Sequence, residues 1–162
     1  MEATITKLDA AGILLNRAIE LYLDASDCVS AIVLAGSAED LLQGILTGQG
    51  RSAEAARVQM LSSAQEIAQR LDPGGGAASE KDTINLMRGM FNWLRHNDKK
   101  DDPDAVTWHL DVEAETVIMR ALQNWDVLGG AEPVRAVAFV TAAGKRNEAF
   151  RAWPASGTFT QK

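Results

Sequence analysis

The chain has 162 residues, of which 46% are hydrophobic and 23% are charged, and its formal net charge is −6. This length suits one globular domain with a sizeable core, and the ordinary apolar fraction excludes a globally disordered chain. The acidic balance argues against non-specific binding of duplex DNA, which depends on a basic surface.

The N-terminal segment lacks the basic start and apolar block of a signal peptide. No stretch of the sequence approaches the roughly 18 uninterrupted apolar residues that a membrane span needs. The single cysteine, Cys28, has no second cysteine to pair with, which fits a reducing compartment. We therefore expect a cytoplasmic protein that makes no contact with a membrane.

Helical periodicity dominates the first 50 residues. A first helix is predicted from an apolar stripe at helical spacing, formed by Ile5, Leu8, Leu15, Ile19 and Tyr22. Ser26 or Asp27 can cap the next helix by accepting a hydrogen bond from a free backbone N–H. The first half of this second helix, "SAIVLAGSAED", is small and apolar on all sides, which predicts a central position in a bundle; Gly48 and Gly50 end the helix.

A third helix is predicted over about residues 53–71, with a thinner apolar stripe of Val58, Leu61, Ala64, Ile67 and Leu71. Residues 72–79, "DPGGGAAS", form a loop because three glycines after a proline lose too much entropy in a regular element. Ser79 and Asp82 resemble a capping box that opens a fourth helix. This helix carries an apolar stripe of Ile84, Met87, Phe91 and Leu94.

The segment "NDKKDDPD" separates the fourth helix from a fifth, because Pro103 disfavours helix at the residue before it. The fifth helix begins near Asp111 and carries a stripe of Ala114, Val117, Ile118, Ala121, Trp125 and Leu128. Residues 133–150 have a composition that suits a strand, but no second strand exists to pair with them, so we predict a helix. We expect an all-α bundle of five or six helices over residues 1–152 and a loose tail over 153–162.

The predicted fourth helix has an unusual polar side. Four residues at helical spacing form one line along it, namely Asn85, Arg88, Asn92 and His96, and Gly89 leaves this side locally bare. A solvated face is usually built from Glu, Lys and Gln, whereas Asn, Gly and His are poor helix formers. The face therefore gives up helix stability, which indicates a recognition or chemical role. In the alternative interpretation, these side chains cap neighbouring helices or form hydrogen bonds across the bundle.

Other chemical motifs are incomplete. The histidines and aspartates of residues 96–109 lack the paired spacing of a zinc site and the ordered oxygens of a calcium loop. Cys28 lies at a predicted helix N-terminus, where a thiolate is stabilised, but a role as a small core residue is the ordinary one. No nucleotide-binding fingerprint is present. We predict neither a metal nor a cofactor. Trp108 and Trp153 are candidate interface residues, although burial would fit them equally.

Three segments together resemble the HEPN superfamily of small helical bundles, over roughly residues 10–128. They are the first amphipathic helix, "AIVLAGSAEDLLQGIL", and a late helix ending "FNWLRHND" before an acidic, proline-containing turn. HEPN ribonucleases carry an arginine four to six residues before a histidine, often with a polar residue after the arginine. The resemblance implies a homodimer in which the two motifs meet at a cleft and cleave RNA without a metal.

Position by position, His96 matches the family histidine and Asn92 matches the polar residue, but Phe91 stands where the family has its arginine. Arg88 lies one turn earlier, and Arg95 is adjacent to His96. This departure favours a non-catalytic, dimeric binding module. Such a module would contact a partner protein, a nucleotide or RNA through Asn85, Arg88, Asn92, Arg95 and His96.

The sequence is also compatible with two other functions. One is a divergent metal-independent ribonuclease, with His96 as general acid or base and Arg88 contacting the phosphate. The other is a site for a small molecule within the bundle, which would need an apolar pocket.

Overall fold

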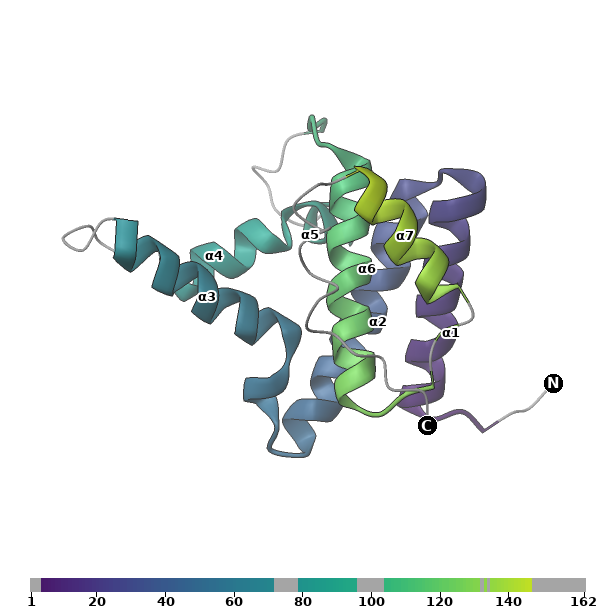
Figure 1. The fold of residues 1–162 in the computed structure, drawn as a ribbon, viewed down its shortest axis with the longest axis horizontal. Helices are drawn as coiled ribbons and strands as arrows, with labels where there is room; N and C mark the ends of the chain where they lie inside the picture. Colours follow the sequence, from purple (N-terminus) through teal and green to yellow (C-terminus); the bar gives the residue numbers. More distant parts are fainter. Residues whose placement is uncertain (1–3, 72–78, 96–103, 132, 134, 147–162) are drawn as a thin grey trace.

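The computed structural model describes residues 4–71, 79–95, 104–131, 133 and 135–146. All regular structure in these segments is helical, which confirms the predicted all-α class (Figure 1). The α-helices are α1 (Lys7–Glu20), α2 (Cys28–Gly48), α3 (Ala56–Leu71), α4 (Glu80–Met87), α5 (Gly89–Arg95), α6 (Leu110–Val127) and α7 (Ala136–Arg146). A π-helical turn, Leu21–Ala25, follows α1, and a 3-10 turn, Ser52–Glu54, precedes α3.

The core of the protein lies where α2 packs against α1 and α6 (Figure 1). The predicted stripes of α1 and α6 face this core, except that Ile5 precedes α1 and is exposed. The small residues of α2 allow both neighbours to approach closely. The fully buried apolar side chains include Leu15, Ile19, Ile32, Leu42, Val117 and Ile118. The predicted central position of the second helix is therefore confirmed.

The starts of α1 and α2 are fixed by side-chain caps. Thr6 and Asp9 form a capping box, in which each side chain accepts a hydrogen bond from the backbone N–H of the other. Of the two candidate caps for α2, Asp27 accepts from Ser30 N, whereas Ser26 adopts the left-handed conformation that separates the two helices. These bonds hold the pKa values of Asp9 and Asp27 below the ordinary range of aspartate.

The predicted fourth helix is two helices. The run of α-helical residues is interrupted at Arg88, so that α4 ends at Met87 and α5 begins at Gly89, although Arg88 N still donates to Ile84 O and Arg88 O accepts from Asn92 N. This break explains why the described residues contain seven α-helices rather than five or six. The predicted cap at Ser79 is present, because its Oγ accepts a hydrogen bond from Asp82 N.

The α3 and α4 helices project from the bundle as an arm (Figure 1). At the base of this arm, Ala56 N donates to Asn124 Oδ1 of α6 over 2.7 Å. The thin apolar stripe predicted for this helix is buried only at its base: Leu61 is buried, whereas Ala64 and Ile67 are exposed. The reason is geometric: α3 leaves the bundle after Leu61, so the core helices do not cover its outer turns.

The ambiguous C-terminal segment contains a helix, as predicted, over Ala136–Arg146. Phe139 of α7 is buried and packs edge-to-face on Tyr22, with ring centroids 5.4 Å apart. Arg135 forms an ion pair with Asp24. The predicted tail over 153–162, which includes Trp153, lies outside the described residues.

One described helix, α2, is long and apolar enough by length and composition to cross a membrane. The core helix of a globular bundle meets the same criteria, and α2 is packed between α1 and α6.

Candidate functional site

Two adjacent acids near the middle of α2, Glu39 and Asp40, organise a highly charged region. Successive residues on a helix point about 100° apart. Glu39 is therefore fully buried between α2, α3 and α6, while Asp40 reaches the surface beside α5, with its side chain 33% exposed. Each carboxylate binds more than one arginine.

Glu39 forms the inner part of this region. Arg120 of α6 donates from Nε to Glu39 Oε1 over 3.0 Å and from Nη2 to Oε2 over 3.2 Å. Arg57, in the first turn of α3, donates from Nε to Glu39 Oε1 over 3.3 Å. All three side chains are buried, so each charge depends on its partners for stabilisation.

Asp40 forms the outer part, because three guanidinium groups converge on its carboxylate. Arg57 Nη2 lies 3.0 Å from Oδ1, Arg88 Nη2 lies 2.8 and 2.7 Å from Oδ1 and Oδ2, and Arg95 Nη1 lies 3.3 Å from Oδ2. The Arg88 side chain is 16% exposed and that of Arg95 is 42% exposed. We call Asp40, Arg57, Arg88 and Arg95 the Asp40 cluster.

The ring of Phe91 supports the two outer arginines. The guanidinium carbons of Arg88 and Arg95 lie 4.8 and 4.9 Å from its centroid, within the range of cation–π attraction. Phe91 is itself buried against α2 at Gly36, where a Cβ atom would come within 2.3 Å of the ring. The missing side chain at Gly36 therefore allows Phe91 to hold both arginines beside Asp40.

Positive charge is in excess in this region. Four guanidinium groups bind two carboxylates, Glu39 and Asp40. Burial, and then the nearby charge of Arg57, lower the pKa of Arg88, whereas Asp40 acts in the opposite direction. Arg88 Nε and Arg120 Nη1 are buried and have no hydrogen-bond partner among the described residues. The excess positive charge of the region therefore favours the approach of further negative charge.

Glu113 of α6 lies near the inner part, where burial raises the pKa of its carboxyl and Arg120 opposes the shift. The folded state thus binds the proton of the Glu113 carboxyl group more tightly than the unfolded state does. The resulting stabilisation is complete below the ordinary glutamate pKa, about 4.3, and is lost as pH rises through the folded-state pKa.

We therefore expect Glu113→Gln to stabilise the protein more at pH 7 than at pH 4, relative to wild type. Glutamine cannot ionise, so the variant does not incur the cost of a partly buried carboxylate at neutral pH. Urea unfolding at both pH values measures the difference. Equal differences at the two pH values, or a variant less stable than wild type at pH 7, would contradict this role for burial.

The predicted polar face is only partly preserved. The predicted line is divided between two helices: exposed Asn85 lies on α4, and half-buried Asn92 lies on α5. Arg95, which was predicted as a binding residue, joins Arg88 on Asp40. His96 lies outside the described residues.

Gly89 is covered rather than bare. A Cβ atom at this position would come within 2.7 Å of the Trp108 ring, which packs on the backbone here. Trp108 nevertheless remains exposed. An exposed indole therefore lies beside the residue that follows Arg88.

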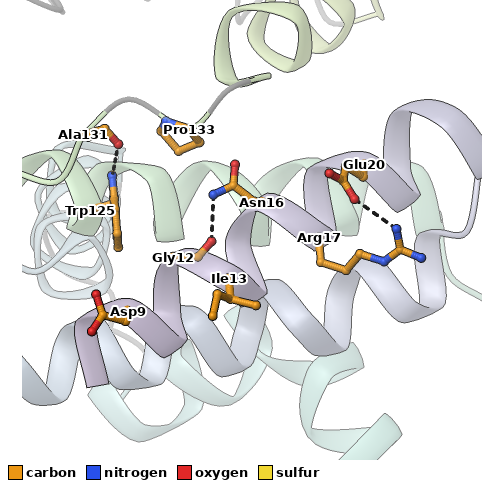
Figure 2. A pocket seen from close by; sticks show the side chains of 9 residues that line it. All are labelled: Asp9, Gly12, Ile13, Asn16, Arg17, Glu20, Trp125, Ala131 and Pro133. Atoms are coloured by element: carbon orange, nitrogen blue, oxygen red, sulfur yellow. Dashed lines mark hydrogen bonds and ion pairs between the residues drawn. The ribbon is translucent and has the colours of Figure 1, made fainter. Parts of the chain in front are cut away.

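An open groove of about 690 Å³ lies along α1, on another part of the molecule (Figure 2). Its lining residues are Asp9, Gly12, Ile13, Asn16, Arg17, Glu20, Trp125, Ala131 and Pro133. Its polar side chains bind one another or nearby groups: Asn16 donates to Gly12 O, Trp125 Nε1 donates to Ala131 O, and Arg17 pairs with Glu20. No set of free polar groups converges there among the described residues, so the groove gives little support to a small-molecule site.

Other sequence-based candidates have ordinary positions. Cys28 is the half-buried first residue of α2 and packs against the core. In the described part of the chain, no group of three or more His, Cys, Asp or Glu side chains could hold a metal ion. Most of the acidic turn, residues 96–103, lies outside that part.

Glu39, Asp40, Arg57 and Arg120 were not among the residues predicted from the sequence. Glu39 carried a usable signal, because an acid in a central apolar helix must find an opposite charge. No protein-family model, curated protein or solved structure matches this chain.

Proposed function

We propose that the protein is a non-catalytic, homodimeric binding module of the HEPN type that binds single-stranded RNA at the Asp40 cluster. The observation that carries this proposal is the convergence of three guanidinium groups on the single carboxylate of Asp40. A phosphodiester would be attracted to the excess positive charge, and guanidinium groups bind phosphate in two-point geometry.

The groups around the cluster favour RNA over an acidic peptide. Single-stranded RNA is recognised by stacking of bases on aromatic or guanidinium planes and by hydrogen bonds to base edges. Exposed Trp108 offers a stacking surface beside Gly89, and exposed Asn85 offers an amide. The net charge of −6 restricts the positive region to a small area, which suits a short single strand better than a duplex.

A divergent ribonuclease using His96 and Arg88 is the weaker proposal. Phe91 stands where HEPN ribonucleases have their arginine, and Arg88 lies one turn earlier. Stabilisation of transition-state charge requires a cation aimed at the reacting phosphate. If wild type cleaves RNA and both His96→Ala and Arg88→Ala lose this cleavage, the protein is a ribonuclease and the non-catalytic proposal is refuted.

We expect Arg95→Gln to weaken binding of a fluorescently labelled short single-stranded RNA about tenfold in an anisotropy titration. Arg95 is the most exposed cation of the cluster, and loss of a hydrogen bond to a charged group costs about 1.5–3 kcal/mol.

The matched control is Arg17→Gln. It removes the same charge from an exposed side chain that also pairs with a carboxylate, Glu20, and it should bind RNA like wild type. A wild-type protein that does not bind RNA, or an Arg95→Gln variant with unchanged affinity, would refute the proposed site.

A further inference from the structure

The arginine side chains that the structure describes are in excess over their acidic partners at one place. Elsewhere in the described chain each arginine of an ion pair binds a single carboxylate; these arginines are Arg17, Arg51, Arg70 and Arg135. Lys81, the basic residue of α4, lies between Glu80 and Asp82 in the sequence. Around Glu39 and Asp40, by contrast, four guanidinium groups face two carboxylates, which leaves an excess of two positive charges.

Part of this excess is accessible to a ligand. The Arg95 side chain is 42% exposed and that of Arg88 is 16% exposed, whereas those of Arg57 and Arg120 are 10% and 3% exposed. The outer two guanidinium groups can therefore contact an anion, and the inner two attract it through their charge. Among the described residues Glu113 Oε1 has no hydrogen-bond partner, and burial raises the pKa of this carboxyl, which favours its neutral form.

Asp40 affects a ligand through its charge alone. Its two oxygens accept four hydrogen bonds from Arg57, Arg88 and Arg95, which is about the full capacity of a carboxylate. A hydroxyl or amino group of a ligand therefore finds no free acceptor on Asp40. The remaining attraction is that between the excess positive charge and an anion, and it grows with the number of negative charges on the anion.

The compact shape of this charge favours a single phosphate group. Proteins that bind a single strand along its length use a positively charged groove that follows the backbone. Here the excess is centred on one carboxylate, Asp40. The phosphate with the largest charge on a strand is a terminal phosphomonoester, with about −1.5 to −2 at pH 7, whereas each internal phosphodiester carries a single negative charge.

We propose that the Asp40 cluster binds the terminal phosphate of an RNA strand, a phosphomonoester at its 5′ or 3′ end, in preference to the phosphodiesters within the strand. This inference rests on the proposed RNA site and names the group that the site recognises. The charge of a phosphomonoester matches the excess of two positive charges. The terminal base would lie beside Arg88, where exposed Trp108 packs on Gly89 and offers a stacking surface.

Anisotropy titrations of the full chain with one short RNA, labelled at an internal base, test this preference. The RNA carries a 5′ phosphate, a 3′ phosphate or hydroxyl groups at both ends. We expect a phosphorylated form to bind at least about tenfold more tightly than the hydroxyl form, because its additional charge strengthens the hydrogen bonds from Arg88 and Arg95. The matched ligand is a hydroxyl-ended strand one nucleotide longer, which adds a phosphodiester instead and should bind like the shorter hydroxyl form.

Two substitutions change the charge of the cluster in opposite directions. Arg95→Gln lowers the excess to one and should reduce the ratio of the two affinities, phosphorylated over hydroxyl, at least about threefold. Asp40→Asn raises the excess to three and should increase this ratio, while Arg17→Gln, at a separate ion pair, should leave it unchanged. A ratio that is the same in Arg95→Gln as in wild type would overturn the inference.

The titrations also separate this inference from the proposed function. Equal affinities of wild type for all forms of the RNA would refute terminal recognition, while weaker binding of every form by Arg95→Gln would still support the RNA site. A wild-type protein that binds none of the forms would refute both.

Discussion

Glu39→Ala is expected to lower the free energy of unfolding by about 3–5 kcal/mol. Glu39 binds buried Arg120 through both carboxylate oxygens and also binds buried Arg57. Without this carboxylate, the Arg120 guanidinium has no counterion within bonding distance among the residues that the structure describes, and the remaining described partner of Arg57 is Asp40. The cost arises mainly from leaving these cations buried, and the cavity left by the shorter side chain adds to it.

Urea denaturation at pH 7 measures this loss. Glu66→Ala is the matched control, because Glu66 also pairs with an arginine of a helix but at an exposed position. Exposed pairs contribute little, so the control should unfold at nearly the wild-type midpoint. A loss of less than about 1 kcal/mol for Glu39→Ala, which is ordinary for any substitution, would show that the Arg57–Glu39–Arg120 contacts do not secure the fold.

Gly36→Ala is expected to destabilise the protein, whereas Gly44→Ala on the same helix is expected to stabilise it. A Cβ atom at Gly36 would lie 2.3 Å from two ring atoms of buried Phe91, while a Cβ atom at Gly44 meets nothing within 4 Å. Both substitutions gain the preference of alanine for helix, about 0.5–1 kcal/mol. Their difference therefore isolates the overpacking cost, about 1–3 kcal/mol.

The Gly36 substitution has a second consequence, because Phe91 supports Arg88 and Arg95. A displaced ring would move both guanidinium groups, so Gly36→Ala should also bind RNA more weakly than Gly44→Ala. Denaturation midpoints and RNA titrations of the two variants are measured side by side. Equal midpoints would show that the ring moves aside without cost and that the close contact at Gly36 does not position the cluster.

The helices of the core were predictable because their apolar residues recur with a helical period. The stripe from Ala114 to Ala121 is buried as expected, and the small residues of α2 lie at the centre of the bundle. The cap at Asp27 was predictable because its side chain accepts a hydrogen bond from Ser30 N, three residues later. The sequence pattern was sufficient for features that depend on residues close together in the chain.

Helical periodicity was insufficient where the structure depends on contacts between segments that are far apart in the chain. The spacing of Ala64 and Ile67 indicates a helix, which is present, but periodicity cannot tell whether another layer lies opposite. The break at Arg88 interrupts a segment with continuous helical spacing. Its position coincides with the contacts of Arg88 to Asp40 and of Gly89 to Trp108, neither of which is local in sequence.

The candidate site was predicted in part. Arg88 and Arg95 were identified from the unusual polar side of one helix, but their common partner is Asp40, 48 and 55 residues earlier in the chain. A single sequence does not specify which of its acids an arginine will meet. The buried Glu39–Arg120 pair, 81 residues apart, was nevertheless open to inference, because a buried charge requires a partner.

The salt dependence of RNA binding tests the Asp40 cluster as an RNA site most directly. The logarithm of the association constant falls with the logarithm of salt concentration, with a slope of about −0.7 for each phosphate of a single strand that is neutralised. We expect the slope for Arg95→Gln to be shallower than that for wild type by about 0.7, and the slope for Arg17→Gln to equal that for wild type. Identical slopes for wild type and Arg95→Gln would contradict a phosphate contact at the Asp40 cluster.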